Sequence, residues 1–154
     1  MHNTRDVETL ATALVELIGF LNSPQRDDVL LREAGVALDR ALFPLLVRLG
    51  MSGPLSVAGL ADQVGRDHTT LSRQLAKLEG MGLIVREGQG SDRRVRAASL
   101  TPVGAVVVQA ITAARQRLLS RVLADWSDAD LAGLAGLNRR FVDALSAAGR
   151  SQPK

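Results

Sequence analysis

The sequence predicts a mainly α-helical protein with one small β-hairpin, and three observations support this fold class. Apolar residues make up 46% of the 154 residues, which is enough for a core. Aromatic residues contribute only 3%, so the core must consist of Leu, Val and Ala, and Leu and Ala favour helices. Apolar residues recur at helical spacing in most segments, whereas β-type residues gather only at 83–85 and 95–100, around a Gly-rich turn.

The N-terminal part of the chain contains two expected helices and a link between them. The first helix has an apolar residue at every third or fourth position, the heptad pattern of a helix that packs along another; these residues are Val7, Leu10, Leu14, Leu17 and Leu21. After Asn22-Ser23-Pro24, a short helical turn is expected at 27–34, closed by Gly35. The second apolar helix is expected at 38–49, and Gly50 and Gly53-Pro54 mark the next break.

Capping residues define two short helices in the middle of the chain. Ser56 is a good N-cap for the first helix, and Gly65 supplies its C-terminal stop. Asp67 caps the second helix, which Gly80 and Gly82 end. The two helices are therefore joined by a tight turn at 65–67.

The spacing of small and apolar residues within this pair of helices is typical of a helix-turn-helix. The small side chain of Ala61 lets the helices approach closely, Gly65 makes the turn, and Leu71 plugs the space between the helices. In a helix-turn-helix the second helix lies in the major groove of DNA. The hairpin that follows at 83–100 would then be a wing, which makes the fold class a winged helix-turn-helix with flanking helices.

The second helix of the pair is predicted to present a polar and basic face. At about 100° per residue, Leu71, Leu75 and Leu78 lie on one side of it. Hydroxyl and guanidinium groups on the other side can contact base edges, and an ammonium group can contact phosphates. An ordinary amphipathic helix with a solvated face is the alternative. We expect the DNA-contacting residues to be Arg66, His68, Thr69, Thr70, Arg73 and Lys77.

The excess of positive charge lies in the same region. The whole chain has 19 basic and 16 acidic residues, a net charge of +3. Between Arg66 and Arg96 there are seven basic and four acidic residues, and 7 − 4 gives the same +3. A local basic surface is typical of a protein that binds the phosphate backbone, although a solvated surface can have the same charge.

Two long helices are expected after the hairpin. Thr101 caps the first, with Pro102 at the first helical position. Ser127 and Asp130 form a capping box for the second, which has a Leu-rich stripe from Leu131 to Leu145. This stripe and the heptad pattern of the first helix lie outside a compact winged domain and need partners, so we expect a homodimer.

The hairpin and the start of the next helix carry a family signature. The run Ser91-Asp92-Arg93-Arg94-Val95-Arg96, followed by Leu100-Thr101-Pro102-Val103-Gly104, resembles the MarR family of transcriptional regulators, in which an Asp-x-Arg tip leads through a strand into Leu-Thr-x-x-Gly. The resemblance covers about residues 4–147 and follows the family's order of elements. The link from Pro24 to Leu38, which contains an extra Gly35, departs from the family pattern.

The resemblance implies a single MarR-like domain over residues 1–154. It implies dimerisation helices at about 4–22 and 102–147 and a winged helix-turn-helix at about 38–100. It also implies that Arg94 reaches the minor groove and that Asp92 helps to hold it; Arg93 and Arg96 are further wing contacts. A narrow minor groove concentrates negative potential and favours arginine. The expected partners are therefore double-stranded DNA and a second copy of the chain.

The family also implies a repressor that a small-molecule effector releases. Many of its members bind phenolic or lipophilic molecules in a cleft between the dimer helices and the winged domain. Phe20, Phe43 and Trp126 are candidates to line such a cleft, or they are core residues. The sequence identifies no effector and no effector-binding residue.

Composition argues against an enzyme and against most metal sites. The absence of cysteine excludes disulfides, thiolate zinc sites and cysteine-based redox sensing. The two histidines, His2 and His68, are distant in sequence, and no Gly-rich phosphate loop or nucleophile elbow is present. Ligation of a metal by carboxylates alone stays open, and we expect no cofactor.

A winged-helix module that binds proteins instead of DNA is the remaining alternative. Such a module would not need three wing arginines together with Arg73 and Lys77 on one surface. No run reaches the roughly 18 apolar residues of a membrane-spanning helix, and the N-terminus lacks the apolar region of a signal peptide. We therefore expect a cytoplasmic protein without membrane association.

Overall fold

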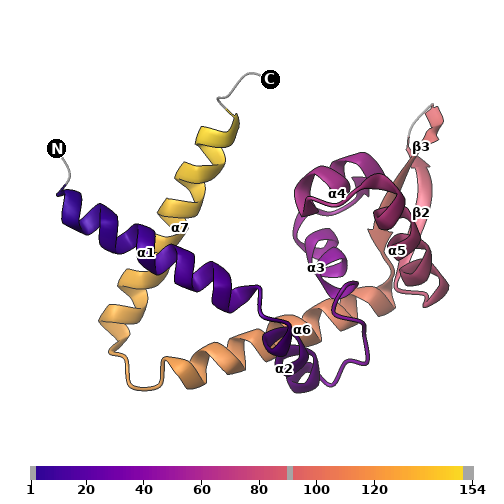
Figure 1. The fold of residues 1–154 in the computed structure, drawn as a ribbon. Helices are drawn as coiled ribbons and strands as arrows, with labels where there is room; N and C mark the ends of the chain where they lie inside the picture. Colours follow the sequence, from indigo (N-terminus) through magenta and orange to yellow (C-terminus); the bar gives the residue numbers. More distant parts are fainter. Residues whose placement is uncertain (1–2, 90–91, 151–154) are drawn as a thin grey trace. The chain divides into compact units, whose positions relative to one another are not determined.

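The computed structural model describes the backbone of residues 3–89 and 92–150 and the side chains of residues 3–88 and 97–149. Within these ranges the chain forms seven helices and a small antiparallel sheet (Figure 1). It divides into two units, Met1–Arg115 and Gln116–Lys154. The first contains α1 to α5, the sheet and most of α6, and the second contains the end of α6 and α7.

The two N-terminal helices follow the predicted pattern with one change of boundary. Helix α1 spans Thr4–Leu21, and the Asn3 side chain caps it by accepting a hydrogen bond from the Arg5 N–H at 3.2 Å. Helix α2 spans Pro24–Ala34, so it begins at Pro24 and not at residue 27. Proline fits this first turn because its nitrogen has no hydrogen to leave unsatisfied. Gly35, with φ 66°, ends α2 as predicted.

The predicted helix at 38–49 is corrected to α3, Phe43–Ser52. Residues 39–42 form a turn instead, since the Asp39 side chain accepts a hydrogen bond from the Ala41 N–H at 2.7 Å and the Asp39 carbonyl accepts one from the Leu42 N–H at 2.8 Å. Gly50 does not break α3. A Cβ at this position would lie 2.8 Å from Cγ1 of Val108 in α6, so glycine here permits close packing of the two helices.

The helix-turn-helix forms as the capping residues predict. Helix α4 spans Val57–Val64, and α5 spans His68–Gly80. The Ser56 hydroxyl accepts from the Gly59 N–H at 3.0 Å, and the Asp67 carboxylate accepts from the Thr70 N–H at 2.8 Å. Gly65 lies between the helices with φ 65°, a conformation that favours glycine.

The sheet has three antiparallel strands in the order β1-β3-β2. They are β1, Leu55–Ser56; β2, Ile84–Gln89; and β3, Asp92–Leu100. The last two form the predicted hairpin, but they extend into the turn expected at 88–92, with a register irregularity at Gly88/Gln89. The short β1, which pairs Leu55 with Ala98, was not predicted.

Helix α6, Pro102–Val122, begins directly against the sheet. The Thr101 hydroxyl donates to the Gly82 carbonyl at 2.6 Å and accepts from the Gly104 N–H at 3.0 Å, so Thr101 is the predicted cap. A Cβ on Gly104 would lie 2.0 Å from the Leu83 carbonyl oxygen, a distance that only glycine avoids. In the second unit, α7 spans Asp128–Arg150, and the Ser127 hydroxyl accepts from the Asp130 N–H at 3.1 Å.

Two clusters form the core of the first unit. The larger one joins α3, α4, α5 and the sheet, and its fully buried side chains are Leu45, Leu46, Leu60, Leu71, Leu75, Leu78 and Ala98. The smaller one joins α2, α3 and α6 through Leu31, Phe43 and Ile111. Leu38, just before the 39–42 turn, packs against both clusters. The cluster that α5 packs into and the cluster that joins α2 and α6 are therefore in contact through Leu38.

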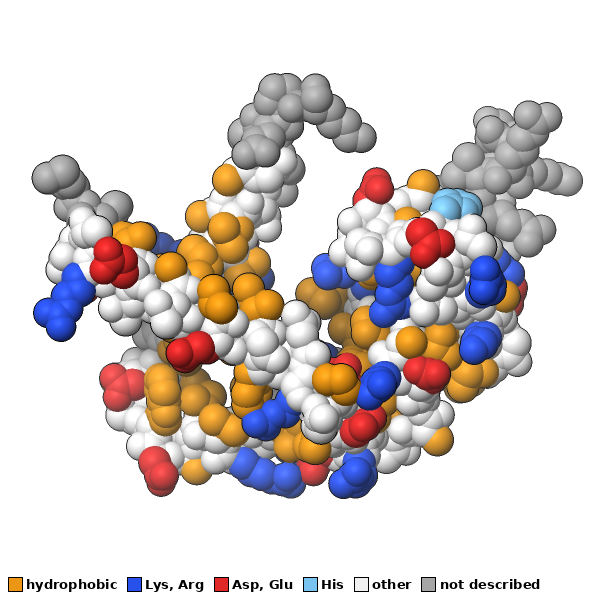
Figure 2. Space-filling view, in the orientation of Figure 1, with side chains coloured by type: hydrophobic (Ala, Val, Ile, Leu, Met, Phe, Trp, Pro, Cys, Tyr) orange, Lys and Arg blue, Asp and Glu red, His pale blue; other side chains and the backbone are white. Residues whose placement is uncertain are grey.

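The first and last helices keep their apolar stripes at the surface (Figure 2). No described side chain of α1 is buried, and Leu21 is 60% exposed. Along α7, Leu137 is 63% exposed, and three further leucines are exposed with it: Leu131, Leu134 and Leu145. Such rows of exposed leucine are unusual in a soluble monomer. No helix in the described part of the chain is both long and apolar enough to cross a membrane.

Candidate nucleic-acid interface

The leucine stripe of α5 fixes which side of this helix faces outward. Leu71, Leu75 and Leu78 are all 0% exposed and pack into the larger core cluster. The opposite side of α5 consequently faces solvent. Of the residues predicted to contact DNA, His68, Thr69, Arg73 and Lys77 are exposed, and Thr70 is half-buried.

Ala76 also lies on the exposed side of α5, between Arg73 and Lys77 along the chain. The sequence prediction did not include it, although positions 69, 73 and 76 have the spacing of one helical face. A small apolar side chain at the centre of a polar face can contact the methyl group of thymine. The exposed face of α5 thus combines hydroxyl, guanidinium, ammonium and methyl groups.

The N-terminus of α5 carries a fixed negative charge. Hydrogen bonds from Thr70, chiefly from its side chain and then from its backbone N–H, lower the pKa of Asp67 below its ordinary value. The Asp67 carboxylate is therefore ionised and held at the helix end, where the positive end of the helix dipole stabilises it. This carboxylate sets the start of α5 and with it the position of His68 and Thr69.

Arg66 was predicted to contact DNA, but its side chain is turned toward the protein. Its Nη1 donates to the Ala41 carbonyl at 2.7 Å and to the Gln74 side-chain oxygen at 2.7 Å. Ala41 belongs to the turn before α3, and Gln74 belongs to α5. The Arg66 guanidinium thus joins the helix-turn-helix to the segment that precedes α3.

A second arginine joins α5 to the wing. In β2, Arg86 donates through Nε to the Glu79 carboxylate at 3.0 Å, and Nη2 bonds the same oxygen. The Arg86 side chain is only 18% exposed, compared with 37% for Glu79. Two of the seven basic residues between 66 and 96 are therefore engaged by protein acceptors, and Arg73 and Lys77 are the described ones that face solvent.

This arrangement matches proteins of known family. The MarR family model matches residues 38–95. The chain is 34% identical over 110 residues to the helix-turn-helix-type transcriptional regulator YxaD of Bacillus subtilis, an alignment that covers 69% of this chain and 77% of YxaD. The chain belongs to the MarR family. It is therefore a DNA-binding transcriptional regulator, as its sequence predicts.

Solved structures of a MarR family protein and of a probable transcriptional regulator have the same fold. A MarR family protein from Bacillus stearothermophilus superposes with a TM-score of 0.78 at 23% identity, over 95% of this chain and 99% of that one. A probable transcriptional regulator from Pseudomonas aeruginosa is 30% identical, with a TM-score of 0.57 over 80% of this chain and 96% of that one. The predicted winged helix-turn-helix with flanking helices is confirmed.

In the outer part of the wing, at residues 89 and 92–96, the structure describes the backbone alone. The pairs Gly88 with Arg96 and Gln89 with Asp92 carry the hairpin beyond the core. This places four of the predicted contact residues at the outer part of the hairpin, and their side chains lie outside the described residues: Asp92, Arg93, Arg94 and Arg96.

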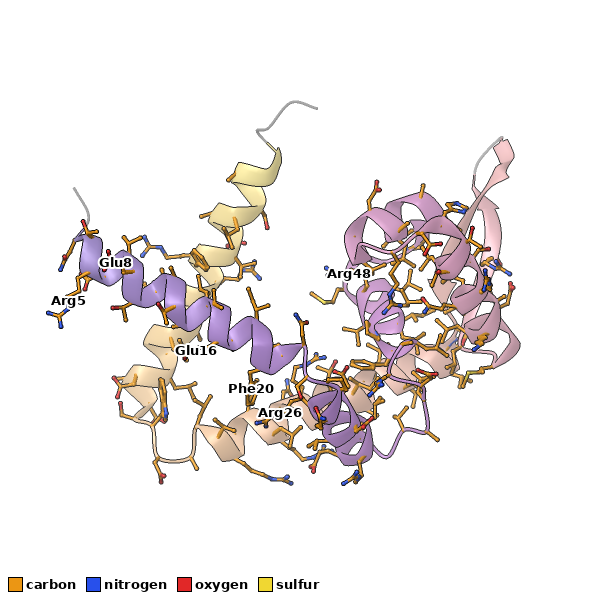
Figure 3. All side chains as sticks on the ribbon, in the orientation of Figure 1. Arg5, Glu8, Glu16, Phe20, Arg26 and Arg48 are labelled. Carbon is orange, nitrogen blue, oxygen red and sulfur yellow. The ribbon has the colours of Figure 1, made fainter. Side chains whose placement is uncertain are left out.

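The three aromatic residues proposed for an effector cleft have different surroundings. Phe43 is 6% exposed and belongs to the core, which is the alternative role that the sequence analysis gave it. Phe20, at the end of α1, is 47% exposed, and the Arg26 guanidinium lies 3.6 Å from the centre of its ring (Figure 3). Trp126, in the second unit, is 47% exposed. Among the described residues, no three His, Asp or Glu side chains form a group that could hold a metal ion.

Proposed function

We propose that this MarR protein binds DNA as a homodimer, with α5 of each copy in the major groove and the β2–β3 wing in the adjacent minor groove. One observation carries the proposal: the leucine stripe of α5 is fully buried, and Thr69, Arg73 and Lys77 are exposed on the side that remains. A helix with this division between core and solvent can enter a groove without losing its packing.

Each predicted contact residue of α5 has a role suited to its chemistry. Arg73 reads a base edge, because its planar fork can donate two hydrogen bonds to guanine. Thr69 and Thr70 supply hydroxyl contacts, and His68 in the first turn contacts the DNA beside them. Lys77 neutralises a phosphate.

The wing supplies the second contact. Arg94 enters the minor groove, and Asp92 orients its guanidinium through a charge-assisted hydrogen bond. Arg93 and Arg96 contact the sugar-phosphate backbone beside the groove. Two observations support this assignment. The backbone of these four residues forms the outer part of the hairpin, and the Arg86–Glu79 pair joins the base of the wing to α5.

The second copy of the chain covers the exposed stripes of α1 and α7. The α1 stripe has heptad spacing and includes Val7, Leu10 and Leu17, all about half exposed. MarR regulators act as dimers, and two copies bring two α5 helices to two half-sites of an operator. The further roles, repression and release by a small-molecule effector, rest on the family resemblance.

Binding to DNA is tested with genomic fragments of the source organism. The purified protein selects fragments from sheared DNA, and the enriched duplex is titrated by fluorescence anisotropy at several salt concentrations. The proposal predicts tight, salt-dependent binding to the enriched sequence and weaker binding to random duplex. Absence of salt-dependent binding to any fragment would support the protein-interaction module instead.

A further inference from the structure

The Arg66 side chain donates hydrogen bonds to two acceptors of the protein. One nitrogen, Nη1, has two hydrogens, and each has an acceptor at 2.7 Å: the Ala41 carbonyl and the Gln74 side-chain oxygen. Both bonds are partly buried, and charged donors in such surroundings form strong hydrogen bonds. The guanidinium therefore connects two elements that lie far apart in the sequence.

The Ala41 end of this connection is held in place. Ala41 lies in the link segment, which we define as residues 36–42, between α2 and α3. Its N–H donates to the Asp39 carboxylate at 2.7 Å, while its carbonyl accepts from Arg66. Both polar backbone groups of Ala41 are thus bonded, and the turn offers a fixed acceptor.

The link segment is in turn fixed to α2 and α6. The Val36 N–H donates to the Leu31 carbonyl at 3.0 Å, and Val36 packs against the cluster of Leu31, Phe43 and Ile111. Leu38 packs on this cluster and on the larger one beneath α5. A shift of α2 or α6 would therefore move the Ala41 carbonyl.

The Gln74 end determines how α5 is oriented. Gln74 is half-buried and directly follows the exposed Arg73 in α5. A bond from Arg66 to Gln74 opposes rotation of α5 about its axis, and rotation would turn Arg73 away from the base edge it reads. Contacts to bases depend on geometry more strongly than contacts to phosphates do.

We propose that Arg66 is a positioning residue, which holds α5 in register with the link segment and so sets sequence preference without touching DNA. This inference rests on the proposed function of α5 as the recognition helix. It reassigns Arg66, a predicted contact residue of the helix-turn-helix, because its side chain binds two protein acceptors. It also makes the link segment the connection between the α2–α6 core and the DNA-reading helix.

The test compares Arg66→Ala, Arg66→Lys and Gln74→Ala with Lys77→Ala, a matched loss of one exposed positive charge. Anisotropy titrations on operator and random duplex, over a range of salt and well below the melting temperature, give the affinity, the operator-to-random ratio and the salt slope. We expect Arg66→Ala to lower operator affinity roughly tenfold, which is the lower limit of the effect of losing a hydrogen bond to a charged group. The operator-to-random ratio should fall as well, while the salt slope should stay unchanged. Lys77→Ala should lower the slope by about one at an unchanged ratio.

The remaining variants distinguish positioning from other roles. Gln74→Ala should lower the ratio in the same direction, and the double variant with Arg66→Ala should lose less than the sum. Arg66→Lys keeps the charge but not the planar geometry, so it should not restore the ratio. A slope lowered by about one in Arg66→Ala, with affinity restored by Arg66→Lys, would make Arg66 a phosphate contact and overturn the inference. A changed melting temperature with an unchanged ratio would also overturn it. Failure of the proposed function would give a different result from these two outcomes, because the wild-type protein itself would then bind operator no more tightly than random duplex.

Discussion

Single residues of α5 divide between those that shape the helix and those that face solvent. Leu71, Leu75 and Leu78 are fully buried, and Asp67 caps the helix, so these residues set where the helix lies. Thr69, Arg73 and Lys77 face solvent and are available to DNA. Substitutions in the second group should therefore change binding while the fold persists.

Arg73 tests the direct reading of sequence. A good bidentate contact discriminates between bases by about 1–3 kcal/mol, so Arg73→Ala should bring operator and random affinities closer by roughly that amount. Anisotropy on both duplexes measures the difference, with circular dichroism melts as the folding control. An unchanged operator-to-random ratio would mean that another side of α5 faces the groove.

Asp67 gives α5 a dependence on pH. Hydrogen bonds from Thr70 lower the pKa of Asp67 in the folded protein, so its stabilising effect is complete above the ordinary pKa of 3.8 and is lost as pH falls through the lower folded pKa. Asp67→Ala should melt below wild type at pH 7, and this gap should narrow in acid.

Asp67→Asn is the matched control, because asparagine also caps helices but does not titrate. Its melting temperature relative to Asp67→Ala should stay constant across the same pH range. If the gap between wild type and Asp67→Ala widened in acid, the carboxylate would not act as the charged cap that its hydrogen bonds indicate.

Arg94 tests the wing. Arg94→Ala should weaken operator binding and leave the melting temperature unchanged, because the outer hairpin lies beyond the core. Asp92→Ala should weaken it less, since the positive charge remains, and Arg94→Lys should not restore full affinity. All effects should diminish at high salt. Unchanged affinity of Arg94→Ala at low salt would leave α5 alone to explain binding.

At the scale of elements, the Arg86–Glu79 pair joins β2 of the wing to α5. Glu79→Gln and Arg86→Ala should each lower stability by up to about 1 kcal/mol, the usual limit for a partly exposed ion pair. They should lower DNA affinity more than stability, since both variants remove the ion pair that fixes the orientation of β2 relative to α5. A double-mutant cycle measured by anisotropy should show coupling, and additive losses would mean that the pair does not position the wing.

Local signals allowed most elements to be predicted from sequence. Ser56, Thr101 and Ser127 cap helices through hydrogen bonds to residues three positions away, which a sequence displays directly. The start of α3 was predicted too early, because the apolar pattern from residue 38 also suits a helix. In the structure the Asp39 side chain instead stabilises a turn before Phe43. The two-residue strand β1 exists only through its pairing with β3, which no local pattern indicates.

The exposed positions of the candidate site could be predicted from the sequence, but the internal bonds of Arg66 could not. The exposed side of α5 follows from helical periodicity, and its exposed side chains were predicted with the exception of Ala76. The partner of Arg66 could not be predicted, because the Ala41 carbonyl lies 25 positions away and any backbone carbonyl would serve as an acceptor. The charge of Arg66 and its place before α5 favoured a DNA contact, and only the fold reveals the two protein acceptors of its side chain.

At the scale of the whole molecule, one proposal, a homodimer, explains both the exposed leucines of α1 and α7 and the exposed polar face of α5. In the proposed homodimer a second copy covers the leucines and also presents a second α5 to the operator. The fold in the first unit has its own core and does not require these stripes. Their exposure is therefore what a dimerising regulator predicts.

The most direct measurement is sedimentation velocity of the protein at micromolar concentration, alone and with a fluorescently labelled operator duplex. Free protein should sediment at twice the 16.4 kDa chain mass, and saturated operator should carry two chains per duplex. A stable, folded monomer in solution, or one chain on each saturated duplex, would contradict the proposed homodimer.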